Sequence, residues 1–190
     1  MIMKINFNRL NSLFVLFAIA TFTACEKDIS EEKVGIENVY IPQSISASTT
    51  DNNYAVPGNV SYGAAKNFKD DEAANKVLVY LGVSKSGEAT AQPFTVNIAS
   101  RADTINQIIA SGADLKLLPA TAYSIPASVS VAAGQSGTSF NMVIDKPTLK
   151  TFAGKKVAAC ITLASPSMYK LNDLTKKVIV IIDVNALLLK

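Results

Sequence analysis

The sequence predicts an all-β protein, an immunoglobulin-like antiparallel β-sandwich of about seven strands with one short helix. Three observations predict it. Apolar residues alternate with a period of two in several separate stretches, clusters of Gly, Pro, Ser and Asn lie between these stretches, and only one stretch has helical spacing. The chain has 2 Cys and no Trp, so the disulfide and buried tryptophan of true immunoglobulin domains are missing and only the architecture carries over.

Four stretches carry the clearest strand signal. Residues 77–83 are apolar in both alternating sets, and residues 178–184 (VIVIIDV) are the most apolar run after residue 25, so we expect both strands to be central. Residues 94–99 alternate with polar residues and should have one solvated face. Residues 157–163 form a further strand.

The segments around these strands are less regular. Residues 37–41 (ENVYI) read as a first strand that ends at Pro42, and residues 43–67 as a loop with a short, irregular strand. Asp70-Asp71-Glu72 could bind a cation, but it has no calcium-loop spacing, and a solvated turn before a strand is favoured. Residues 84–87 (SKSG) read as a turn.

Residues 101–111 are predicted to form the helix, which we expect to cross one end of a sheet. Ser100 and Asp103 resemble a capping box, and Gly112 is placed to end the helix. The apolar residues at helical spacing are Ile105, Ile108 and Ile109.

The turn 133–137 (AGQSG) predicts a hairpin. Apolar alternation precedes it at 129–131 and follows it at 140–144, so these two segments are expected to pair as strands. Leu149 and Phe152 should close the core from the connecting segment that follows.

The N-terminus has the pattern of an export signal. Lys4 and Arg9 precede the apolar run 13–20, which is too short to span a bilayer, and small residues lead to Cys25. This segment resembles the lipobox of bacterial lipoproteins, with Phe22 in place of the usual leucine, a departure that fits the looser lipoboxes of Bacteroidetes. The alternative is an ordinary secretory signal in which Cys25 is incidental.

This resemblance implies a lipid anchor and a location. We predict a signal peptide over 1–24, a flexible tether over 25–36 and one β-sandwich domain over 37–190, with Cys25 lipidated by acyl chains such as palmitate. The protein would be held at the outer membrane, where surface exposure is expected. The acidic residues of 26–33 resemble a surface-export signal, and a plain acidic linker is the equal alternative.

Composition excludes several function classes. Without Lys4 and Arg9, 16 basic and 15 acidic residues remain, and this balance argues against nucleic-acid binding. The absence of His removes the common nucleophile systems and the usual zinc sites. Cys160 is then best read as a small buried hydrophobe. We therefore expect no enzyme activity, no catalytic residues, no metal site and no cofactor.

A carboxylate-based hydrolase is the enzyme alternative. Its candidate acids are Asp145, Asp173 and Asp183, and the sequence gives no reason for them to converge. Asp183 lies in the apolar run 178–184 and is expected at the strand end, facing solvent.

Three local motifs lie in the second half of the chain: Leu118-Pro119 followed by Tyr123 and Ile125, the strand and turn 131–136, and the strand end 143–149. On these motifs, residues 37–185 resemble a domain-of-unknown-function family from the N-terminal end of Bacteroidetes surface lipoproteins. These are packing and turn motifs. The resemblance implies the sandwich fold and, by association, glycan acquisition.

Two functions follow from this reading. The first is a non-catalytic, surface-displayed glycan-binding or accessory module of a glycan-uptake system, whose partner would be a polysaccharide or another surface protein. The alternative is a structural or adhesive scaffold that docks a protein through a sheet edge or through 187–189 (LLL), unless these leucines simply enter the core. The candidate groups for stacking on a sugar, each of which could instead be half-buried structural residues, are Tyr54, Tyr62, Tyr80 and Tyr169.

Overall fold

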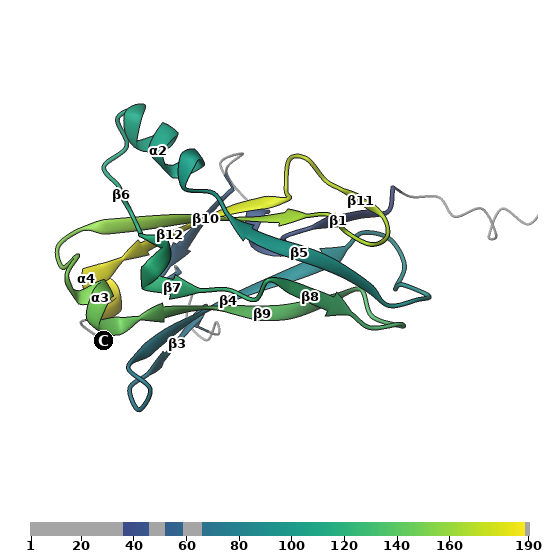
Figure 1. Cartoon of the computed structure of the whole chain (residues 1–190), viewed down its shortest axis with the longest axis horizontal. Coiled ribbons are helices and arrows are strands. Elements are labelled where there is room, and N and C mark those ends of the chain that lie inside the picture. The colour runs from purple at the N-terminus through teal and green to yellow at the C-terminus, as the bar shows by residue number, and fades with distance from the viewer. Residues whose placement is uncertain (1–35, 46–51, 59–65, 189–190) are drawn as a thin grey trace, which may run out of the picture. The chain divides into compact units, whose positions relative to one another are not determined.

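The computed structural model describes residues 36–45, 52–58 and 66–188, which form a two-layer β-sandwich (Figure 1). Contacts divide the chain into two compact units, 1–35 and 36–190, and everything described lies in the second. The all-β sandwich prediction is confirmed. Cys25 and Tyr62 lie outside the described residues, so the predictions made for them stay predictions.

The first sheet has β4 at its centre, as predicted. β9 pairs with β4 along its whole length, and β1 and β3 follow one another along its opposite edge. The order is β11-β1-β4-β9-β7, with β3 beside β4. The strands are β1 (Asn38–Tyr40), β3 (Phe68–Asp71), β4 (Lys76–Lys85), β7 (Tyr123–Ser124), β9 (Gly137–Asp145) and β11 (Lys170–Leu171).

The second sheet has the order β2-β12-β10-β5-β8, with β6 beside β10. The very apolar strand β12 lies between β2 and β10, which confirms its central place. Among the described strands, three pairings are parallel, β1–β11, β2–β12 and β6–β10, so the sandwich is not purely antiparallel. The strands are β2 (Asn53–Val56), β5 (Phe94–Ser100), β6 (Lys116–Leu117), β8 (Ser128–Val131), β10 (Lys156–Ala164) and β12 (Lys177–Asp183).

The main core lies between the two sheets. It contains the inward residues of both, and Leu149 is fully buried in it while Phe152 packs against it half-buried, as expected. Leu187 is also buried, which favours the core reading for the one described end of the leucine run. The largest fully buried side chains in the described residues include Phe94, Leu81, Met142, Ile144, Ile161 and Ile182.

A second apolar cluster lies on the outer face of the second sheet, beneath helix α2 (Ala102–Ala110). Ile105 is completely buried there. The helix therefore covers a sheet face (Figure 1), rather than one end as predicted. This cover explains why β10 and β12 are apolar on both faces. The sheet residues of the cluster are Ala158, Cys160 and Ile179.

The start of α2 differs from the prediction. Arg101 is the N-cap residue and no side chain caps the helix, so the Ser100–Asp103 capping box is wrong. Asp103 instead takes two hydrogen bonds from the Arg101 guanidinium, at 2.9 and 2.7 Å. This ion pair lowers the pKa of Asp103 to about 2. Gly112 does adopt a positive φ, +98°, at the helix end.

The predicted hairpin is wrong. β8 pairs with β5, with Val131 opposite Phe94, whereas β9 pairs with β4 in the other sheet. The turn after Val131 thus crosses from one sheet to the other. A hairpin and a crossing of this kind show the same alternation, because in both cases each strand turns one apolar face to the core.

In the first sheet, β3 and β4 form a hairpin instead. Its turn has no glycine, and Asn75 supplies the left-handed residue with φ +55°. Asp70 and Asp71 belong to β3 rather than to a solvated turn, and the Lys146 ammonium donates to both oxygens of the Asp70 carboxylate, at 2.8 and 2.6 Å. The reading of 70–72 as a turn is therefore corrected for two of its three residues.

Two short helices begin at aspartates that end strands. The Asp145 carboxylate accepts the Thr148 backbone N–H at 2.9 Å at the start of α3 (Lys146–Lys150), and the Asp183 carboxylate accepts the Ala186 backbone N–H at 3.0 Å at the start of α4 (Val184–Leu188). Two 3₁₀ turns, η3 (Pro42–Ser44) and η4 (Ala120–Ala122), complete the elements of the described ranges. No helix in these ranges is long and apolar enough to cross a membrane.

Candidate functional site

The described tyrosines do not form one binding platform. Tyr54 is half-buried on the edge strand β2, and burial raises the pKa of its hydroxyl. Tyr80 points outward from β4 in the other sheet and is 39% exposed. Tyr169 lies in the loop before β11 and packs against the core. The three described candidates of the sequence reading are thus not brought together, and Tyr62 lies outside the described residues.

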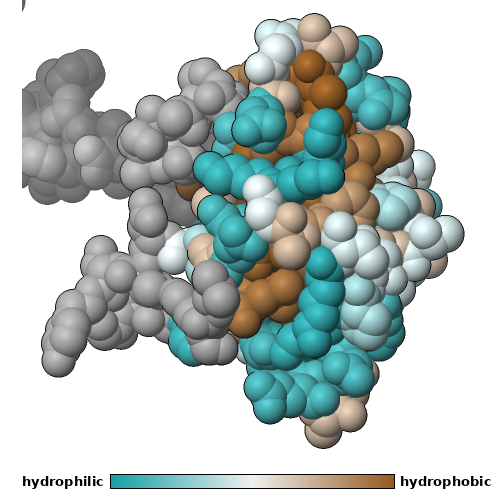
Figure 2. Space-filling model, turned by 90° about the vertical axis from the view of Figure 1, so that its left-hand side faces the viewer, coloured by the Kyte–Doolittle hydropathy of each residue, from teal (hydrophilic) through white to brown (hydrophobic). Residues whose placement is uncertain are grey.

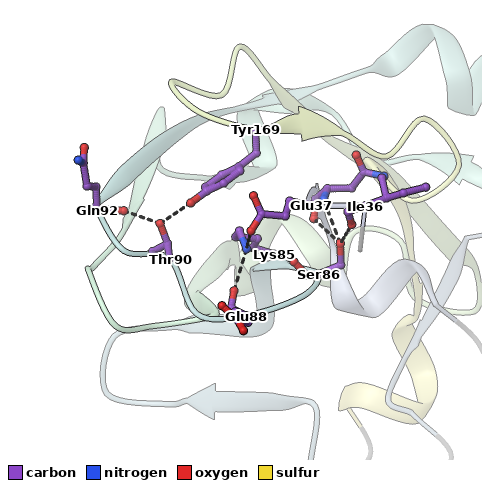
Figure 3. Close-up of polar contacts among 9 residues, drawn as sticks. Ile36, Glu37, Lys85, Ser86, Glu88, Thr90, Gln92 and Tyr169 are labelled. Carbon is purple, nitrogen blue, oxygen red and sulfur yellow. Dashed lines mark hydrogen bonds and ion pairs between the residues drawn. The ribbon is translucent and has the colours of Figure 1, made fainter. Parts of the chain in front are cut away.

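Tyr169 belongs instead to a buried polar group that we call the Lys85 cluster, formed by Glu37, Lys85, Thr90 and Tyr169 (Figure 3). The Lys85 side chain has no exposed surface, whereas Glu37 keeps 35% of its side chain in solvent. Lys85 is the last residue of β4, so the prediction of a turn over 84–87 is wrong for its first two residues. A buried lysine is rare unless it is paired.

All three ammonium protons of Lys85 have an acceptor. The Nζ atom lies 2.8 Å from a Glu37 carboxylate oxygen, 2.7 Å from the Glu88 carbonyl oxygen and 3.2 Å from the Ser86 carbonyl oxygen. Because all three acceptors lie within hydrogen-bond distance, the Lys85 side chain is fixed in place, and these contacts stabilise the fold. A catalytic amine would need a free lone pair.

Tyr169 closes the cluster from the other side. Its ring centroid is 4.8 Å from the Lys85 ammonium, a cation–π contact, and 5.2 Å from the Phe94 ring in an edge-to-face arrangement. Its hydroxyl lies 2.7 Å from the Thr90 hydroxyl, which also donates to the Gln92 carbonyl oxygen. These contacts hold Tyr169 at φ +67°, a conformation that a bulky residue seldom adopts.

The cluster fastens the first described residues to the sandwich. The Ser86 hydroxyl donates to the Ile36 carbonyl oxygen and accepts the Asn38 backbone N–H at 2.9 Å, next to the Glu37–Lys85 pair. Strand β1 then lies between β4 and β11. These contacts can hold the first described residues, from Ile36 to Asn38, in place at one end of the sandwich.

The sequence pattern could have predicted that Lys85 faces the core, but the interpretation of residues 84–87 as a turn obscured it. Val77, Val79, Leu81 and Val83 face the core, and the same alternation extended by two residues places Lys85 on the core face. Its partners Glu37 and Tyr169 come from distant parts of the chain, and local patterns carry no information about them.

The candidate acids do not assemble a catalytic pair. Asp145 takes hydrogen bonds from Thr148 and from the Lys76 ammonium, and these contacts, the Thr148 hydroxyl first, hold its pKa well below the usual range. Asp173 pairs with Lys176 on the surface, and this pairing lowers its pKa. Asp183 caps α4, at a strand end as expected. No group of three metal-binding side chains occurs in the residues the structure describes.

Cys160 is a free thiol under helix α2. Only 2% of the residue is exposed, and burial is the main cause that raises the pKa of the thiol. A protonated, inaccessible thiol is unreactive. This placement agrees with the reading of Cys160 as a small hydrophobe.

A hollow of about 580 Å³ lies at the end of the second sheet, where β6 and β10 begin and β12 ends. Figure 2 shows the molecule from the side of α3 and α4, where polar and apolar surface alternate. Sequence reasoning missed this site because its residues come from three separate segments. The lining residues are Asp114, Lys116, Gly154, Lys155, Lys156, Asp183, Asn185 and Ala186.

Comparisons with known proteins identify the family. A family model described as "-like, N-terminal domain" matches residues 36–170, more than half of the chain. None of the curated proteins compared with the chain matches it.

Solved structures from Bacteroides ovatus share the fold. One, described as "a putative carbohydrate binding protein", is 13% identical with a TM-score of 0.53, over 76% of this chain and 36% of that one. A second, of unknown function, is 16% identical with a TM-score of 0.53, over 76% and 46%. A third, "a Multidomain protein including DUF1735", is 14% identical with a TM-score of 0.50, over 76% and 44%. This chain thus spans less than half of each, and the likeness shows the fold.

Proposed function

Because the chain belongs to the "-like, N-terminal domain" family, we propose that it is a non-catalytic module of a glycan-uptake system, held at the outer surface of the cell by lipid on Cys25. Its task is to bind glycan or to assist the proteins that do. The family membership agrees with the resemblance to Bacteroidetes surface lipoproteins seen in the sequence.

The observation that carries the proposal is the way the N-terminal end of the domain is fastened. The Lys85 cluster holds Glu37, the first residue after the proposed tether 25–36, and the neighbouring Ser86 hydroxyl donates to the carbonyl oxygen of Ile36, the last residue of that tether. A module attached to a membrane through its N-terminus needs this connection to be firm. The similar structure described as "a putative carbohydrate binding protein" supports the glycan part of the proposal.

Lipidation has a definite energetic meaning. Each buried methylene group contributes about 0.8 kcal/mol, so a single acyl chain binds reversibly and a triacylated cysteine holds firmly. Labelling cells with an acyl-chain analogue should mark the wild type and leave Cys25→Ala unlabelled. Cys160→Ala is the matched control and should label like the wild type, because Cys160 is buried. Equal labelling of wild type and Cys25→Ala would contradict the anchor.

Surface display is tested separately. Protease added to intact cells should degrade the protein, while a periplasmic control protein stays intact. Protection of the protein until the outer membrane is opened would show that it faces the periplasm.

The glycan role is tested by a glycan array on the purified protein. Saturable binding of at least one glycan class supports it. No binding, together with capture of one defined surface protein at stoichiometric amounts, would favour the scaffold function instead.

A further inference from the structure

We propose that the hollow lined by Lys116, Lys155 and Lys156 binds an anionic sugar, a uronate or a sulfated residue within a glycan. This inference rests on the proposed glycan role and adds the place of binding and the ligand class. The tyrosines of the sequence reading take no part in it.

Strand pairing brings the polar groups of the hollow together. Lys156 on β10 is the register partner of Asp183 on β12, and Lys116 on β6 is the partner of Val157, the next residue of β10. Three neighbouring strands therefore deliver charged side chains to the same end of one sheet. The turn before β10 and the start of α4 complete the wall.

The lysines of the hollow form no ion pair within the described residues. In the described residues, six ion pairs occur and none includes Lys116, Lys155 or Lys156. Two aspartates, Asp114 and Asp183, share the hollow, so its lining has a net charge of +1. The field favours an anion, and the surrounding solvent keeps the attraction moderate.

The other polar groups of the hollow suit hydroxyls. One Asp183 oxygen takes the Ala186 backbone N–H, and the Asn185 side-chain oxygen takes the Gly154 backbone N–H at 2.8 Å. The second Asp183 oxygen and the Asn185 amide N–H groups stay available as an acceptor and as donors. Gly154 has φ +80° and open space where a side chain would stand, so a ligand can approach its backbone.

The residues that line the hollow favour an acidic sugar over a neutral sugar or a nucleic acid. No aromatic residue lines it, so a neutral sugar would find no stacking surface. A nucleic acid needs a continuous basic face, and the two aspartates interrupt it. A sugar with one carboxylate or sulfate group combines the anion that the lysines favour with the hydroxyls that Asp183 and Asn185 can bind.

The position of the hollow also agrees with attachment of the domain through its N-terminus. It lies beside α4, at the opposite end of the sandwich from β1 and β11 (Figure 1). If the chain is held through the residues before Ile36, the hollow is turned away from the point of attachment.

The test is a calorimetric titration of the purified protein with trigalacturonate and with a chondroitin sulfate disaccharide. Cellotriose is the neutral control, and inorganic sulfate is the free-anion control. We expect saturable binding of at least one acidic sugar, weakened at least tenfold in the double variant Lys155→Gln/Lys156→Gln. Lys170→Gln, an exposed lysine on β11, should bind like the wild type, and all variants should unfold at the wild-type temperature.

Four outcomes would overturn the inference. Acidic sugars bound equally well by the double variant, or binding of cellotriose alone, would place the site elsewhere and leave the glycan role standing. Sulfate bound as tightly as the sugars would indicate an adventitious ion only. No binding of any of these probes, with an empty glycan array, would remove the site and the glycan role together.

Discussion

The two ends of the sandwich use lysine in opposite ways. At the end where the described chain begins, Lys85 is completely buried and its three donors are all used. At the other end, Lys155 and Lys156 are exposed and without an ion pair in the described structure. The same residue type is a structural fastening in one place and a candidate ligand-binding group in the other.

The difference follows from solvation. A buried ammonium must recover its lost hydration from protein groups, so its partners become indispensable to stability. An exposed ammonium is hydrated by water and contributes little to folding, so it is free to bind a ligand. The predictions below test this contrast, starting with the largest expected effect.

Replacement of Lys85 by alanine should cause the largest loss. It removes the ion pair, leaves the Ser86 and Glu88 carbonyl groups without their donor and opens a void under Tyr169. We expect the free energy of unfolding in urea to fall by about 3 kcal/mol. Lys170→Ala is the matched control and should stay within about 0.5 kcal/mol of the wild type. A similar small loss in both variants would contradict the structural role of Lys85.

Tyr169→Phe should have an intermediate effect. It keeps the ring over Lys85 and against Phe94 and deletes only the hydroxyl that contacts Thr90. The expected loss is about 1 kcal/mol, the usual contribution of one hydrogen bond of this kind. Tyr54→Phe, on the edge strand at a half-buried position, is the comparison and should lose less. The opposite order would show that the Thr90 contact is dispensable.

Asp145→Asn should make the protein less stable at neutral pH, with a smaller effect and a distinct pH dependence. The pKa of Asp145 is depressed below its ordinary value of 3.8, so the charge stabilises the fold above pH 3.8 and this contribution fades as the pH falls further. The asparagine can still accept the Thr148 backbone N–H, so the variant keeps the helix cap and removes the charge together with the Lys76 contact. Unfolding curves of the two proteins should therefore converge toward pH 2. A difference that is independent of pH would contradict the assignment.

The lysines of the hollow should matter least to stability. Lys116→Gln, Lys155→Gln and Lys156→Gln should each unfold within about 0.5 kcal/mol of the wild type. A loss comparable to that of Lys85→Ala would show that these residues hold the fold and are not reserved for a ligand.

The sequence pattern predicted where strands and the helix form better than it predicted which strands pair with one another. The apolar runs that became β4 and β12 identified the central strands, and the isoleucine spacing located α2. The hairpin of β8 and β9 was wrong because apolar alternation states that a strand faces a core and does not say which sheet it joins. Likewise, the local pattern at Ser100 and Asp103 did not reveal that Arg101 would engage the carboxylate.

The sites were harder to predict than the fold. Lys85 could have been found by extending the alternation of β4, but its pairing with Glu37 spans 48 residues and depends on the final topology. The hollow combines residues from 114 to 186 that only strand register brings together. The tyrosines were chosen by residue type, and residue type does not determine whether side chains converge.

The most direct test of the fastening at the N-terminal end is a double-mutant cycle. The variants are Lys85→Met, Glu37→Gln and their combination, and the quantity measured is the free energy of unfolding in urea. We predict a coupling energy of about 2 kcal/mol between the two residues. The same cycle on the exposed pair Lys176 and Asp173 should give a clearly smaller coupling. Equal coupling for the two pairs would contradict the claim that burial makes the Lys85–Glu37 pair the fastening of the domain.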